Sequence, residues 1–163
     1  MHSVFCFKRF KVRQESSSMK VNTDAVLLGA WAGIPLGNEP FFFLDIGTGT
    51  GVIALMIAQR LSDLKLNFRA TAIDPDHNSV NESAFNFANS PWASSLSAKE
   101  MTLEEFMLME KGDCFDIIVT NPPFFTNSLK SSSSRKSASR HNEILPFSTI
   151  VKASEYLLKQ DGK

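Results

Sequence analysis

The sequence contains little cysteine, and its only two, Cys6 and Cys114, lie far apart. Neither has a second cysteine or a histidine at zinc-ligand spacing, so we expect no metal site and no disulfide framework. Long apolar runs are also missing, because stretches such as residues 41–44 are far shorter than the ~20 residues of a membrane span. The Met1 end shows no apolar signal-peptide core. These absences favour a cytoplasmic protein without a membrane partner and leave its oligomeric state open.

Charge of one sign is not in excess, since 17 basic and 17 acidic residues cancel. Net charge alone therefore predicts no polyanionic partner. The cations are nevertheless clustered, and such clusters either bind phosphate groups of RNA or are ordinary solvated side chains. The first cluster comprises Lys8, Arg9, Lys11, Arg13 and Lys20, and the second, our candidate RNA-binding set, comprises Lys130, Arg135, Lys136 and Arg140. The serine-rich residues 128–139 around the second cluster predict a mobile loop.

Apolar runs and helical patterns do alternate along the chain. A strand or one arm of a hairpin is expected at 4–12, and a helix at 25–31, capped by Asn22, Thr23 and Asp24. Strands are predicted at 41–46, 68–73, 96–101 and 115–120, and helices at 52–61 and 147–158, with one more after the second strand that carries Val80, Ala84, Phe87 and Ala88 on one face. This order predicts a Rossmann-like α/β fold, with a mostly parallel sheet covered on both faces. We expect one domain over 1–163, with an N-terminal segment (1–40) and a core (41–163).

A glycine-rich stretch follows the first core strand. Its spacing is G-x-G-x-G, and Val52 stands where a dinucleotide-binding loop has its last glycine. An acidic residue two positions before the first glycine also disfavours a pyrophosphate and favours a cationic ligand without phosphate, such as S-adenosylmethionine. A carboxylate ending the second strand is suited to accept bonds from ribose hydroxyls. The predicted cofactor-binding residues are Asp45, Gly47, Gly49, Gly51 and Asp74; the alternative is a tight turn with a helix-capping Asp74.

The fourth strand ends in Asn121, Pro122, Pro123 and Phe124. Two prolines fix the backbone and remove two donors, which leaves carbonyl oxygens free to accept. The Asn121 side-chain oxygen and the Pro122 carbonyl could hold an amine that is about to be methylated, and Phe124 could stack on its base. The alternative is a rigid turn that leaves the strand. We name these four residues as the candidate catalytic set.

These two motifs together resemble class I S-adenosylmethionine-dependent methyltransferases that modify exocyclic or amide nitrogens. The N-terminal residues 7–12 and 19–31 indicate one family within this class. They are similar to a bacterial family that methylates the 6-amino group of an adenine beside the anticodon of a valine tRNA, and so are residues 125–130 and 138–141. The resemblance covers nearly the whole chain.

The resemblance implies S-adenosylmethionine as cofactor, tRNA as substrate, and Thr23 and Asp24 as part of a segment that closes over the cofactor. It also implies a polar contact to the cofactor's adenine after the third strand, for which residues 96–105 offer no clear match. Family members continue through further strands, so we expect a C-terminally truncated chain. Methylation of guanine's exocyclic amine in ribosomal RNA, and a catalytically silent RNA-binding module, are the alternatives.

Overall fold

The computed structural model describes residues 3–34, 40–122 and 145–163. Its strands are β1 (Val4–Cys6), β2 (Lys11–Arg13), β3 (Phe41–Ile46), β4 (Phe68–Asp74), β5 (Leu96–Glu100) and β6 (Ile117–Thr120). Its helices are α1 (Thr23–Trp31), α2 (Val52–Asp63), α3 (His77–Ala88), α4 (Leu103–Met109) and α5 (Phe147–Leu157), with a 3-10 turn η1 (Ala93–Ser95). The predicted core strands and helices and the helix before them are present, and where bounds were predicted they differ by no more than two residues.

A four-stranded sheet in the order β5-β4-β3-β6 forms the centre of the fold. All three pairings within it are parallel, as the alternation of strands and helices predicted. The carboxyl ends of its strands therefore meet at one edge, where open α/β sheets bind their ligands. At this edge Ile46 of β3 lies between Ile73 of β4 and Thr120 of β6.

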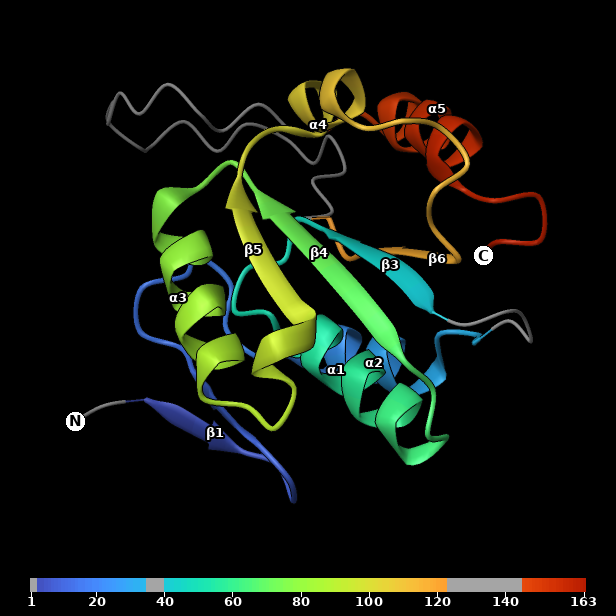
Figure 1. Ribbon diagram of the computed structural model, residues 1–163. Helices are drawn as coiled ribbons and strands as arrows, with labels where there is room; N and C mark the ends of the chain where they lie inside the picture. The colour runs from blue at the N-terminus through green and yellow to red at the C-terminus, as the bar shows by residue number, and fades with distance from the viewer. Residues whose placement is uncertain (1–2, 35–39, 123–144) are drawn as a thin grey trace, which may run out of the picture.

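Helices cover both faces of this sheet, which confirms the layered architecture (Figure 1). One core joins the sheet to α2 and also contains Phe10 and Val12 of the N-terminal segment. The opposite core contains Phe106 of α4 and Leu157 of α5. Both layers are needed because a parallel sheet is apolar on its two faces.

The N-terminal segment, expected as a strand or one hairpin arm, forms both strands of a short hairpin, and α1 forms as expected. β1 and β2 pair antiparallel, and the Asn22 side chain accepts a hydrogen bond from the Ala25 amide at the start of α1. Helix α4 was not predicted, although the sequence contains its capping box. The side chains of Thr102 and Glu105 each accept a hydrogen bond from the other residue's backbone amide.

The buried face of α3 differs from the one predicted. Phe87 is buried, but Ala84 and Ala88 are exposed, and polar residues turn inward instead. The buried polar residues of this helix are Ser79, Glu82, Ser83 and Asn86. The apolar-face rule failed here because backbone from the N-terminal segment, rather than an apolar layer, lies against this side of the helix.

None of the helices in the described part of the chain has the length and apolar character that a bilayer crossing demands.

Candidate active site

The glycine loop joins β3 to α2 at the carboxyl edge. Gly47, Gly49 and Gly51 all have positive φ, of 70°, 53° and 79°, a conformation that other residues adopt only with strain. The amides of Gly47 and Thr48 donate to the Ile73 carbonyl at 2.9 and 3.1 Å, which ties the loop to the end of β4. The three glycines thus form a tight turn at the carboxyl end of β3.

The three glycines serve different needs. A Cβ on Gly51 would lie 2.5 Å from the Phe87 ring of α3, whereas a Cβ on Gly47 would meet nothing within 4 Å. Gly51 is therefore required by internal packing. Gly47 leaves open space beside the strand ends, where a ligand could approach the backbone closely.

These contacts predict different costs for two alanine variants. Gly51→Ala should lower the free energy of unfolding by about 2 kcal/mol, because a strained φ is combined with a steric clash. Gly47→Ala should cost only about 1 kcal/mol, since it adds strain without a clash. Urea denaturation of both variants measures the difference, and equal losses would contradict the packing role of Gly51.

Asp45 is fully buried beneath this loop. Its Oδ2 accepts a hydrogen bond of 2.7 Å from the Thr48 hydroxyl. Its Oδ1 has no partner with hydrogen-bond geometry among the described residues. The Ala54 amide is nevertheless near enough to the carboxylate to lower its pKa. Burial raises the pKa of Asp45 from 3.8 to about 7, against the opposing effect of the Thr48 hydrogen bond. A buried carboxylate whose hydrogen bonds are incomplete is costly to the folded protein, and an opposite charge nearby would reduce that cost.

Asp74 ends β4 and faces the same loop. One of its oxygens accepts the Gly49 amide and the other accepts the Asp76 amide, both at 2.9 Å. Burial raises the pKa of Asp74, and these two hydrogen bonds oppose the rise. Each carboxylate oxygen still has a second lone pair, so the side chain can accept two hydroxyl donors from a ligand.

Asn121 directly follows β6 and reaches the same edge. It lines a cavity together with Gly47 and Gly49 of the glycine loop. The structure thus brings the two sequence motifs together, although about 70 residues separate them in the chain. Pro122 is half-buried beside Asn121. Pro123, Phe124 and the four cations of the candidate RNA-binding set lie outside the described residues.

The N-terminal segment forms the remaining wall of this cavity. Its lining residues are Met19, Lys20, Asn22 and Ala25. The predicted Thr23 and Asp24 begin α1 and are exposed, so they neighbour the cavity without lining it. The cavity wall is formed by neighbours of Thr23 and Asp24 rather than by these two residues, and this placement depends on tertiary contacts.

Other charged residues follow the neighbouring strand ends. Glu100 ends β5, pairs in register with Asp74, and lies 2.6 Å from His77 Nδ1. Glu100 lies within residues 96–105, where the sequence offered no clear match to the family's contact with the cofactor's adenine, and no contact of that kind is assigned to it. Among the N-terminal cations, Arg9 pairs with Asp63 and the Arg13 guanidinium lies 3.8 Å from the centre of the Phe85 ring.

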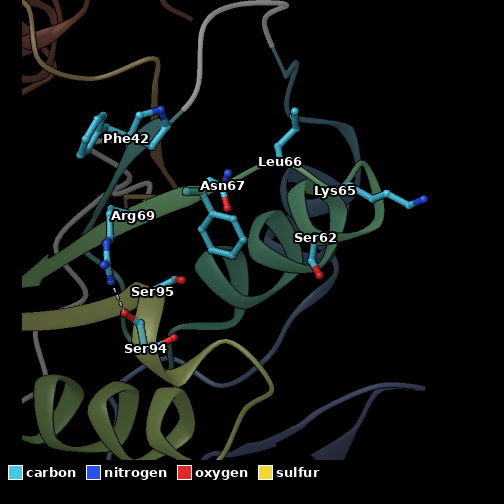
Figure 2. A pocket seen from close by; sticks show the side chains of 10 residues that line it. Phe42, Ser62, Lys65, Leu66, Asn67, Arg69, Ser94 and Ser95 are labelled. Atoms are coloured by element: carbon cyan, nitrogen blue, oxygen red, sulfur yellow. Dashed lines mark hydrogen bonds between the residues drawn. The ribbon is translucent and has the colours of Figure 1, made fainter.

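A larger hollow lies at the opposite edge, where β3 and β4 begin. Phe42, Ser62 and Asn67 are among its lining residues. Its two cations do not converge, because Arg69 donates to the Ser94 carbonyl while Lys65 points away (Figure 2). This hollow therefore lacks the polar convergence of the carboxyl edge, and we place the candidate site at the latter.

The parallel sheet, the glycine loop entering α2 and the acidic end of β4 define a Rossmann-like α/β fold of the class I methyltransferase type. The sequence model of the methyltransferase small domain matches residues 38–163, so the chain belongs to that family. A solved geranyl diphosphate C-methyltransferase from Streptomyces coelicolor shares this fold, with a TM-score of 0.57 and 11% identity over 85% of this chain and 43% of that one.

Curated relatives are closer in sequence. A tRNA1(Val) (adenine(37)-N6)-methyltransferase of Flavobacterium psychrophilum is 40% identical over 98% of this chain and 65% of its own length. The protein of the same name from Bacteroides thetaiotaomicron is 40% identical over 97% of this chain and 63% of its own length. The chain thus spans a little under two thirds of these relatives.

Proposed function

We propose that this chain binds S-adenosylmethionine at the carboxyl edge and that the protein transfers its methyl group to the exocyclic amino group of an adenine in tRNA. The observation that carries the proposal is the position of Asn121 in one cavity with the glycine loop. A methyl donor held by the loop and an amine held by Asn121 would then be neighbours. The names of the curated relatives support adenine and tRNA as the target.

In this proposal the cofactor is bound by the ends of β3 and β4 and by the glycine loop. Asp45 attracts the ammonium group, directly or through water, and Asp74 accepts the ribose hydroxyls. Gly47 and Gly49 admit the ligand to the backbone, and Gly51 keeps the loop packed on α3. The cofactor supplies the electrophilic methyl group, and the chain's own residues supply position and charge.

The residues after β6 hold the target. The Asn121 side-chain oxygen and the Pro122 carbonyl accept the two amino hydrogens, so the nitrogen lone pair turns away from the ring and toward the methyl group. The amine loses its proton after the transfer, and this order needs no base to activate it. Pro123 and Phe124 complete the motif, with Phe124 stacking on the base. Lys130, Arg135, Lys136 and Arg140 are proposed to contact the RNA backbone.

The N-terminal segment belongs to the same proposed unit, a single methyltransferase domain over 1–163. Phe10 and Val12 support this because they are buried in the same core as the sheet and α2. Thr23 and Asp24 are proposed to help position the segment that faces the cofactor, through their place at the start of α1.

Methyl transfer from labelled S-adenosylmethionine should distinguish this reaction from its alternatives. Separate assays on total tRNA, ribosomal RNA and ribosomal protein should show label in the tRNA fraction, on N6 of adenine after nucleoside digestion. Label on guanine of ribosomal RNA would favour the alternative reaction, methylation of guanine's exocyclic amine. Binding of tRNA without any transfer, by protein that binds S-adenosylhomocysteine, would favour a silent RNA-binding module.

A further inference from the structure

Helix α3 contains a carboxylate that the proposed reaction does not use. Glu82 has an exposed fraction of 0% and lies on the polar face that α3 turns inward. A buried charge is costly unless other groups satisfy it by hydrogen bonds and an opposite charge. The partners of Glu82 therefore show what its burial achieves.

Three successive backbone amides of the N-terminal segment point at Glu82. Glu15 donates to Oε1 at 2.7 Å, and Ser17 donates to Oε2 at 2.8 Å. The Ser16 amide lies between them, 3.1 and 3.2 Å from the two oxygens. The Arg13 Nε, 3.5 Å from Oε1, adds a positive charge. Consecutive amides around one anion form a concave backbone nest, here closed on a carboxylate of the same chain.

Asn86, one turn further along α3, extends the attachment toward the glycine loop. Its Oδ1 accepts the Arg13 amide at 2.8 Å. Its Nδ2 donates to the carbonyls of both Arg13 and Thr50, each at 2.9 Å. A single buried side chain thus connects the end of β2 to the loop that precedes α2.

Beyond Ser17 the segment continues directly to the candidate site. The Ser17 hydroxyl donates to the Met19 carbonyl at 3.2 Å and lies 3.2 Å from the Ser79 hydroxyl of α3. It would also lie 3.3 Å from a Cβ placed on Gly49. The Val21 amide donates to the Gln14 side chain at 2.9 Å and so closes residues 14–21 into a loop. Met19, within that loop, lines the cavity.

We propose that Glu82 is a positioning residue for the cofactor pocket: by binding the amides of residues 15–17 it holds residues 19–22 against the glycine loop. This inference rests on the proposed function, since it concerns the affinity of that same pocket. Glu82 binds the N-terminal segment and does not line the cavity, so it affects ligand binding only through that segment. Its contribution is to prepare the pocket wall before the ligand arrives, which lowers the ordering cost of binding.

Glu82→Gln tests this with little change of shape. The side-chain NH2 group of glutamine donates hydrogen bonds and does not accept them. It would face a backbone amide that donates to the carboxylate in the parent protein, so at least one of these hydrogen bonds would be lost. Val12→Ala is the matched control, because it removes methyl groups from a buried residue of β2 without touching residues 15–17. Both variants should be less stable than the parent protein. Their free energies of unfolding show how large each loss is, so that the two can be compared.

Two readouts separate positioning from general stability. Calorimetry with S-adenosylhomocysteine, well below both melting temperatures, should show an affinity about 10-fold weaker for Glu82→Gln and within about 2-fold of the parent for Val12→Ala. Hydrogen exchange without ligand should accelerate at the amides of residues 15–17 in Glu82→Gln alone. Equal affinity losses in both variants would overturn the positioning role.

The outcomes distinguish this inference from the proposed function beneath it. If the parent protein binds no S-adenosylhomocysteine, the proposed cofactor site itself is wrong and the inference ends with it. If the parent binds but Glu82→Gln binds equally well, only the inference is wrong. If Glu82→Gln does not fold, Glu82→Asp decides, because it keeps the charge but draws the carboxylate back from the amides of residues 15–17; unchanged affinity in Glu82→Asp would then overturn the proposal.

Discussion

Asn121→Ala is expected to lower the rate of methyl transfer to tRNA about 100-fold or more, the loss typical of one well-placed polar contact to a transition state. Affinity for S-adenosylmethionine should stay within about threefold, because the proposed cofactor contacts come from Asp45, Asp74 and the glycine loop. Single-turnover rates, measured with the full-length protein, and calorimetry on the same preparation test both statements.

Three further measurements make this result specific. Asn121→Asp should recover part of the rate because it keeps an acceptor at the same position. Ile118→Val, on β6 three residues before Asn121, controls for general disturbance of the strand and should leave the rate nearly unchanged. A stable Asn121→Ala protein with near-normal turnover would refute the assigned role, and a parallel fall in melting temperature and cofactor affinity would indicate that Asn121 only shapes the turn.

Asp45→Asn should weaken S-adenosylmethionine binding about 100-fold, since the proposed charge partner of the cofactor's ammonium group is lost. The same variant should make the ligand-free protein more stable above pH 7. The parent buries a carboxylate there, whereas asparagine buries a neutral group of the same shape. We expect the melting temperature to rise by roughly 3–8 °C at about pH 8.

The pH dependence follows from the sign of the shift. The pKa of Asp45 rises from 3.8 to about 7 in the folded protein, so the folded state binds more protons than the unfolded state between these values. The stability contributed by protonated Asp45 is complete below pH 3.8 and is lost as the pH rises through 7. A cationic ligand favours the ionised form instead, so cofactor affinity should fall about 5- to 10-fold from about pH 7.5 to about pH 6.

Differential scanning fluorimetry and calorimetry across this range test the prediction. Asp45→Asn should flatten both profiles, while Asp63→Asn, which removes an exposed carboxylate at the end of α2, should leave them unchanged. A parent affinity that is independent of pH would show that Asp45 does not meet the cofactor's positive charge.

The sequence by itself determined the elements and the two motifs, because both are written in short-range patterns. Apolar runs predicted β3, β4 and β6, and the glycines could be assigned to a turn because few other residues adopt positive φ. The parallel order then brought the ends of β3 and β6 together, so Asp45 and Asn121 could be expected at one edge. Helix α4 was also within reach, through the capping box of Thr102 and Glu105.

Only the tertiary structure decided which side of α3 is buried and what encloses the candidate site. Glu82 bonds amides 65 to 67 residues away, and no local periodicity contains such a contact. The apolar pattern of α3 predicted that its apolar side chains are buried. A carboxylate is buried instead, because backbone donors from the N-terminal segment form hydrogen bonds with it. The same long-range packing leaves Thr23 exposed and puts Met19 in the cavity wall. Such pairings arise from how distant segments meet, and that depends on the whole fold.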